Sequence, residues 1–189
     1  SRQVYKDLDI GTGKVPISYE PPRGESTKLS TPTTVGVTYY KGVRHYLIDV
    51  ANPKMTFTVV DYQKLSKRAI AEILKKGKLP IICGGTGLYI DALICDLKFP
   101  AVPPDQKLRK KLEKETAEKL FEKLKNLDPR RAEAIDRFNK RRLIRALEIV
   151  LKTKKAVPEY IEVRPQDIES PYEVMKIGIK KDLPELKKL

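Results

Sequence analysis

The sequence contains little of what several classes of protein require. Its single histidine, His45, excludes a metal site built from several histidines. Its two cysteines, Cys83 and Cys95, do not form a CxxC pair, and a reduced, intracellular protein is the simple interpretation. No apolar run approaches membrane-spanning length, and none has the pattern of a signal peptide. We therefore expect a cytoplasmic protein without a membrane partner.

Positive charge, in contrast, is abundant. The 189 residues include 39 Lys and Arg against 25 Asp and Glu, so the formal net charge is +14. Such an excess favours a polyanion such as nucleic acid as a partner, although a merely soluble basic protein would carry it too. The placement of the arginines has to decide between these two interpretations. Hydrophobic residues make up 40% of the chain, which is enough for a buried core, and we expect a monomer.

The first 98 residues alternate strand and helix patterns. Residues 45–50 and 79–83 are predicted to be buried strands, and the second run is continuously apolar, as in a parallel sheet. A helix is expected between them, from a capping box at Thr58 to a glycine stop at Gly77. This order predicts an α/β fold with a parallel sheet, so residues 1–98 are assigned to a partial α/β core.

The composition changes beyond a proline-rich junction. Residues 99–160 are dense in Lys, Arg and Glu and are predicted to form a helical insertion, with N-caps at Asp128 and Asn139. Residues 174–179 then have the pattern of a strand that returns to the sheet, so residues 161–189 are assigned to the core again. The sequence therefore predicts an α/β core interrupted by helices.

The two ends and one long loop complete this outline. The chain begins at Ser1 without a methionine and ends at Leu189 inside a helical pattern, so we expect an internal piece of a longer protein. Residues 16–41 are rich in Pro, Ser, Thr and Gly and are predicted to form a long surface loop.

A glycine-rich loop, Gly84-Gly85-Thr86-Gly87, follows the second predicted strand and precedes a helix. Glycine lets the backbone approach a ligand closely, and the helix N-terminus offers free N–H groups that suit phosphate. Thr86 adds a hydroxyl group that can donate or accept. A purely structural turn explains the same residues, so the loop by itself favours a binding function only modestly.

A basic helix is predicted over residues 139–148. Arg141 and Arg145 lie four residues apart on one face, away from the apolar stripe that contains Leu143. A row of guanidinium groups can fork onto phosphates or stack on unpaired bases. The alternative is a solvated face with Arg145 paired to Glu148, and for an isolated charge run that alternative is the commoner one.

Other residues give weaker indications. The segment 1–6, with small polar and basic side chains, suits hydrogen bonds to a base edge. Arg109 has the pattern of an ordinary solvated arginine, and His45 is expected to cap or pack at a strand start rather than to act as a catalyst.

Five ordered segments together resemble the tRNA dimethylallyltransferase (isopentenyl-tRNA transferase) family. They are SRQVYKDLDIGTGK at residues 1–14, GVRHYLID at 42–49, ICGGTGLYI at 82–90, Asp128-Pro129, and RRLIRALE at 141–148. Their order across nearly the whole chain is far more specific than any one of them. The resemblance implies a P-loop-kinase-like parallel sheet core, incomplete here, with a helical insertion domain that grips the tRNA anticodon stem-loop.

The resemblance also implies the reaction. Such enzymes move a dimethylallyl group from dimethylallyl diphosphate to the exocyclic amine of the adenosine next to the anticodon on its 3′ side. Residues at matching positions are then tRNA contacts: Ser1, Arg2, Gln3, Thr86, Arg109, Arg141, Arg142, Leu143, Ile144 and Arg145. The match shifts the expected role of the Gly84–Gly87 loop from holding phosphate to contacting nucleic acid.

Part of the family's machinery is not in these residues. The P-loop that holds the diphosphate and Mg²⁺, and the aspartate expected to act as general base, would both precede Ser1. The segment Gly11-Thr12-Gly13-Lys14 does not supply that P-loop, because Leu8 and Val15 stand where a Gly and a Ser or Thr are needed. We therefore expect the piece alone to be inactive in prenyl transfer.

Two other functions fit part of the pattern. A P-loop-type small-molecule kinase would explain the α/β half but not the arginine-rich helix. A non-catalytic RNA-binding module would explain the charge without any chemistry.

Overall fold

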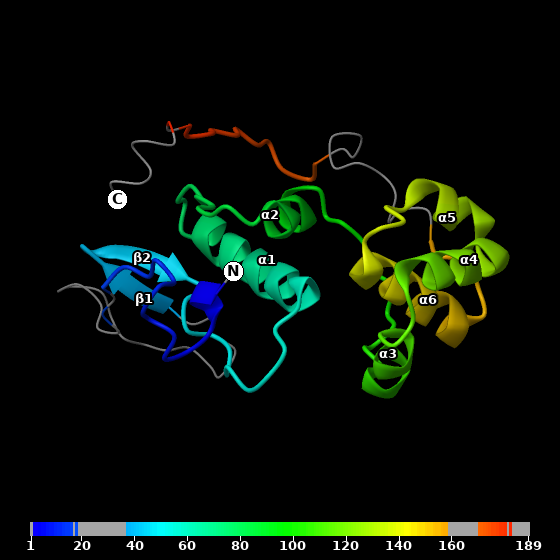
Figure 1. Cartoon of the computed structure of the whole chain (residues 1–189). Helices are drawn as coiled ribbons and strands as arrows, with labels where there is room; N and C mark the ends of the chain where they lie inside the picture. Colours follow the sequence, from blue (N-terminus) through cyan, green and yellow to red (C-terminus); the bar gives the residue numbers. More distant parts are fainter. Residues whose placement is uncertain (1, 17, 19–36, 159–169, 181, 183–189) are drawn as a thin grey trace.

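The computed structural model describes residues 2–16, 18, 37–158, 170–180 and 182. The elements are a 3₁₀ helix η1 (Arg2–Val4), strands β1 (Val37–Tyr40) and β2 (Val43–Tyr46), and helices α1 (Val59–Lys75), α2 (Gly87–Ile94), α3 (Gln106–Leu112), α4 (Ala117–Leu127), α5 (Pro129–Ala134) and α6 (Lys140–Thr153). Figure 1 shows them in two groups. The core unit holds η1, the strands, α1 and α2, and the helical unit (residues 99–158) holds α3 to α6.

The sheet of the described residues is a two-stranded antiparallel hairpin. Val37 pairs with Tyr46, and Tyr40 with Val43. Lys41 and Gly42 both have positive φ, 48° and 76°, which is the signature of a turn whose twist matches the hairpin. The predicted long loop at residues 16–41 is therefore wrong for residues 37–40, which form β1, and residues 17 and 19–36 lie outside the described part.

The predicted strand at 45–50 is also wrong in its bounds. β2 ends at Tyr46, because Leu47 and Asp49 adopt φ of 64° and 55°, which the extended conformation does not allow. The chain then makes one isolated parallel bridge, between Tyr5 and Ala51. Since a single bridge fixes no sheet, the described residues show only the hairpin and do not show the predicted parallel sheet.

The other two predicted strands are extended but unpaired among the described residues. Leu79 and Ile81 are 82% and 77% exposed, and Ile177 is 82% exposed. A strand exists only through hydrogen bonds to a neighbour, and the described chain offers none to the runs at 79–83 and 174–179. The predicted strands at 79–83 and 174–179 are therefore wrong for the described structure, because their apolar residues have no neighbouring strand to pair with and remain exposed.

Helices α1 and α2 pack against each other and form most of the core unit. The capping box predicted at Thr58 is confirmed, with the side chain of Asp61 accepting from the Thr58 N–H at 2.9 Å. Gly77 follows the helix with φ of 65°, as a glycine stop requires. Tyr62 of α1 stacks on Tyr89 of α2 with ring centroids 4.6 Å apart.

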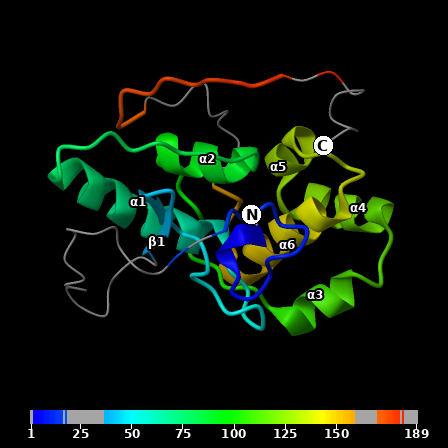
Figure 2. The same cartoon turned by 90° about the vertical axis from the view of Figure 1, so that its left-hand side faces the viewer.

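Residues 170–180 lie along the far side of α2 from α1, as both views show (Figures 1 and 2). Their start is held by Ser170, whose Oγ donates to the carbonyl of Ile94 at 2.5 Å. This contact brings a segment that follows the helical unit back to the core unit.

The helical unit is organised around one apolar core. Its buried members are Leu112, Leu120, Leu124, Ala132, Ile135, Leu143, Ile144, Ala146, Leu147, Ile149, Val150 and Val157. The predicted N-caps are confirmed, since Asp128 accepts from the N–H of Arg131 at 3.0 Å and Asn139 accepts from that of Arg142 at 3.3 Å. α6 therefore has a fixed start and a fixed buried face, which settles where its arginines lie.

No helix in the described ranges has the length and apolar character to cross a membrane.

Candidate nucleic-acid interface

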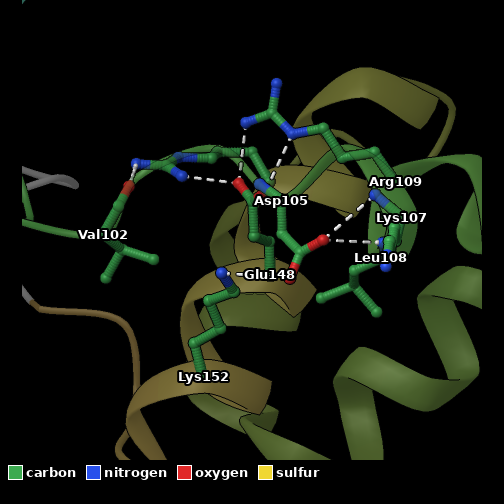
Figure 3. Close-up of polar contacts among 8 residues, drawn as sticks. Val102, Asp105, Lys107, Leu108, Arg109, Glu148 and Lys152 are labelled. Carbon is green, nitrogen blue, oxygen red and sulfur yellow. Dashed lines mark hydrogen bonds and ion pairs between the residues drawn. The ribbon is translucent and has the colours of Figure 1, made fainter.

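A buried carboxylate joins two of the predicted contact residues in the helical unit (Figure 3). Glu148 of α6 is fully enclosed and accepts from Arg109 of α3 through both oxygens, from Nε at 2.9 Å and from Nη2 at 2.7 Å. Arg145 donates from Nη1 to the Oε2 atom of Glu148 at 2.5 Å. The N–H of Asp105 adds a fourth bond, to Oε1 at 2.6 Å.

The charge on Glu148 is strongly favoured by these donors. Burial by itself would raise its pKa, but the hydrogen bonds from Arg109, Asp105 and Arg145 outweigh burial and lower the pKa to about 2. The pKa of Arg109 is raised by its hydrogen bond to the same carboxylate. Glu148 is therefore ionised near neutral pH. Because arginine is always charged in proteins, the cluster of Glu148, Arg109 and Arg145 carries a net charge of +1.

The same cluster anchors the segment that leads into the helical unit. Arg145 donates from Nη2 to the carbonyl of Val102 at 2.9 Å. Asp105 caps α3 through the N–H groups of Lys107 and Leu108, and forms an ion pair with Lys152 of α6 at 3.0 Å. The hydrogen bond of Arg145 to Glu148, raised above as the alternative to an RNA contact, is thus real, and it is part of a larger structural cluster.

The remaining residues of the predicted basic segment divide by exposure. Arg141 and Arg142 are exposed near the start of α6, where the described residues include no acidic side chain in the first turn. Leu143 and Ile144, at 0% and 6% exposed, belong to the apolar core. The structure therefore presents the two arginines to solvent and uses the two aliphatic residues to hold the helix that carries them.

The predicted contact segment at the start of the chain folds onto its own loop. Gln3 donates from Nε2 to the carbonyls of Thr12 and Gly13 at 3.1 and 2.9 Å. The same loop is closed by Lys14, a nearly buried ammonium that contacts Asp9 at 2.8 Å and Asp49 at 2.5 Å. Arg2 is exposed beside this loop, and Ser1 lies outside the described residues.

The glycine loop of the core unit is open. Thr86 is exposed at the N-cap position of α2, and its side chain makes no capping hydrogen bond. A Cβ added at Gly85 or Gly87 would meet no atom within 4 Å, so packing inside the described chain does not require these glycines. The loop therefore leaves room for a group that approaches from outside.

The structure thus brings only some of the predicted residues together. Arg109 and Arg145 share one carboxylate, and Arg141 and Arg142 lie on the same helix as Arg145. Gln3 lies in η1 and Thr86 is the N-cap residue of α2, so both belong to the core unit. The residue that the sequence pattern did not single out is Glu148 as the partner of Arg109, because the two are 39 positions apart and only the i,i+3 spacing to Arg145 was visible.

Metal ligation finds no support in this geometry. Within the described ranges, no three His, Cys, Asp or Glu side chains lie close enough to hold a metal ion. The Mg²⁺ implied by the resemblance is expected in a P-loop preceding Ser1, so it stays a prediction, and none of the residues described here is assigned to it.

A model of one protein family matches almost the whole chain. The IPP transferase model covers residues 3–189. The chain belongs to the IPP transferase family. The resemblance inferred from the five ordered segments is thereby confirmed.

Individual members of the family give the same result. A tRNA dimethylallyltransferase of Anoxybacillus flavithermus is 40% identical over 179 residues, which is 95% of this chain and 50% of that protein. One of Acetivibrio thermocellus is 43% identical over 166 residues, or 86% of this chain and 47% of the relative. The chain spans about half the length of these IPP transferase relatives.

Two solved structures of the family are also similar. The tRNA delta(2)-isopentenylpyrophosphate transferase of Staphylococcus epidermidis is 32% identical with a TM-score of 0.47, covering 98% of this chain and 55% of that one. The full-length tRNA isopentenylpyrophosphate transferase of Bacillus halodurans is 41% identical with a TM-score of 0.32, covering 58% of this chain and 38% of that one.

Proposed function

We propose that the protein containing this chain transfers a dimethylallyl group from dimethylallyl diphosphate to the exocyclic amine of the adenosine on the 3′ side of the anticodon in tRNA. The observation that carries the proposal is membership of the IPP transferase family across residues 3–189. Relatives that match 86–95% of this chain are named tRNA dimethylallyltransferase.

The helical unit is proposed to grip the anticodon stem-loop. Arg141 and Arg142 supply exposed guanidinium groups at the start of α6, and the positive end of the helix dipole adds to their attraction for phosphate. Arg109 and Arg145 keep part of their surface open while they hold Glu148. Leu143 and Ile144 contribute through the core that fixes the helix, and residues 99–160 then form the insertion domain.

The core unit is proposed to receive the target adenosine. Thr86 offers an unengaged hydroxyl in an open loop, and Ser1, Arg2 and Gln3 lie in the matching segment at the start of the chain. An exocyclic amine is a poor nucleophile inside a stacked loop, so the base has to be unstacked and held before its proton is removed. Residues 79–83 and 174–179 are proposed to be strands of a P-loop-kinase-like parallel sheet in residues 1–98 and 161–189.

Prenyl transfer tests the proposal directly. The intact protein is incubated with radiolabelled dimethylallyl diphosphate, MgCl₂ and an anticodon stem-loop RNA, and label in the RNA is counted. We expect labelling that disappears when the target adenosine is replaced by guanosine. No labelling of the RNA would refute the proposal, and phosphate transfer from ATP to a small molecule would favour a kinase instead.

A further inference from the structure

Glu148 is the most completely enclosed charged group among the described residues. It accepts four hydrogen bonds: two from Arg109 of α3, one from Arg145 of α6 and one from the backbone N–H of Asp105, the N-cap of α3. A carboxylate that is removed from water is stable only when such donors satisfy it. The folded protein therefore requires both arginine side chains to point at Glu148, and other rotamers of these arginines would leave the buried carboxylate without donors.

Each of the two guanidinium groups is held by two hydrogen bonds. Arg109 forms a bidentate pair with Glu148, which fixes the plane of its guanidinium group. Arg145 is fixed between the same carboxylate and the carbonyl of Val102. An arginine side chain that moves freely in solution loses rotamer entropy when it binds a ligand, and these two side chains have already lost much of it in the folded protein.

Part of each arginine stays accessible. The side chains of Arg109 and Arg145 are 30% and 35% exposed. No contact within the described part of the chain uses the Nη1 atom of Arg109, and Figure 3 shows that nitrogen pointing away from the carboxylate. The exposed N–H donors can therefore reach an anion without breaking the cluster.

We infer that Glu148 is a positioning residue for RNA: it holds Arg109 and Arg145 in one fixed arrangement whose free N–H donors contact the phosphates of the stem-loop. The inference rests on the proposed function, because it names the residue that prepares the RNA surface. Arg141 and Arg142, which are exposed, then act as mobile charges beside this fixed pair.

The direction in which Glu148→Gln changes RNA affinity separates a positioning role from a simple charge effect. Glu148→Gln removes a negative charge close to the RNA surface, so charge alone predicts tighter RNA binding. A positioning role predicts weaker binding, by about tenfold, because the two arginines lose their common partner. Binding is measured with the intact protein and a fluorescent anticodon stem-loop at several salt concentrations.

A matched control gives the pure charge effect. Glu133→Gln, on α5, removes the same charge from an exposed side chain. We expect it to leave the dissociation constant unchanged or slightly lower.

Arg145→Lys keeps the positive charge but loses the planar guanidinium group with its several N–H donors, so we expect weaker RNA binding with an unchanged salt slope. If Arg145→Lys bound the RNA as tightly as the unmodified protein, the positive charge alone would be sufficient for binding at this position.

The outcomes distinguish the two proposals. If the unmodified protein does not bind the stem-loop, the proposed function fails and the positioning role with it. If it binds, and folded Glu148→Gln protein binds equally well or more tightly, only the positioning role of Glu148 is overturned. If Glu148→Gln does not fold by circular dichroism, Arg109→Lys and Arg145→Lys decide: unchanged affinity overturns the inference, and lower affinity at an unchanged salt slope supports it.

Discussion

At the scale of single residues, the buried carboxylate of Glu148 should make the helical unit sensitive to acid. Its folded-state pKa of about 2 lies below the ordinary value of 4.5, so its contribution to stability is complete above pH 4.5 and disappears as the pH falls toward 2. The shift corresponds to about 3 kcal/mol. Comparing the free energy of unfolding of Glu148→Gln with that of the unmodified protein in urea should show this difference at pH 7.

The pH dependence of that difference is the sharper observation. Between pH 4.5 and 2 it should shrink toward zero, because a protonated Glu148 loses the same attraction that glutamine lacks. The pKa of Asp105 is also lowered, first by the N–H of Leu108 and then by Lys152, and this effect cancels in the comparison because both proteins retain it. A difference that stayed constant down to pH 2 would contradict the assigned role of the carboxylate.

Arg141 should act on RNA binding mainly through its charge. The residue is exposed and no hydrogen bond or ion pair in the described chain involves its side chain. Arg141→Gln should lower the salt slope of RNA binding by roughly 0.7–0.9, the share of one phosphate contact. Lys125→Gln on α4, which removes an equal charge, is the control and should leave the slope unchanged. Equal slopes for Arg141→Gln and the unmodified protein would exclude Arg141 as a phosphate contact.

The local spacing of residues explains what could be predicted at this scale. Arg145 and Glu148 are separated by three positions on one helix, so their hydrogen bond could be foreseen as an alternative from the sequence alone. The pairing of Arg109 with Glu148 depends on how α3 crosses α6, and no local pattern contains that information. For the same reason the sequence did not predict that Lys14 and Asp49 close the first loop.

At the scale of elements, Asp128 should be critical for the helical unit. One oxygen of this buried side chain caps α5, and the other accepts from the N–H of Val157 at 2.7 Å. Asp128→Ala leaves two donors without their acceptor, and we expect a loss of about 2–4 kcal/mol in urea unfolding. Asp136→Ala, at an exposed carboxylate that caps only the N–H of Phe138, should cost less than about 1 kcal/mol. Equal losses for the two variants would contradict the role given to Asp128.

Helices were predictable from the sequence and strands were not. The caps at Thr58, Asp128 and Asn139 are local signals, and all three helices begin where those residues indicate. A strand depends on a neighbour elsewhere in the chain, so the apolar runs at 79–83 and 174–179 indicated burial without fixing a partner. The positive φ values of Leu47 and Asp49 could not be foreseen either, because such residues rarely adopt them.

At the scale of the whole molecule, the two exposed apolar runs are proposed to be sheet strands in the intact protein. Backbone amides of paired central strands exchange slowly with solvent. We expect residues 79–83 and 174–179 to be protected from hydrogen exchange in the intact protein and to exchange rapidly in the isolated 189-residue chain. Leu120 and Leu124 of α4 provide the reference, because both lie in an α-helix with their side chains buried in the core of the helical unit. Rapid exchange of both runs in the intact protein would contradict the proposed parallel sheet.

The division into two units gives each a separate part of the proposed reaction. The helical unit concentrates exposed arginines and a preformed arginine pair, and the core unit presents the open loop at Thr86. Variants of the helical unit should therefore change the KM for RNA more than kcat. Steady-state kinetics of Arg141→Gln with saturating dimethylallyl diphosphate would show this, and a loss confined to kcat would place Arg141 near the reacting atoms instead.

The position of the transferred group tests the central claim most directly. After incubation of the intact protein with dimethylallyl diphosphate and the anticodon stem-loop, the RNA is digested with nucleases and the fragments are sequenced by mass spectrometry. The proposed function predicts one dimethylallyl group, on the exocyclic amine of the adenosine that follows the anticodon on its 3′ side. An unmodified RNA, or a dimethylallyl group on another nucleotide, would contradict it.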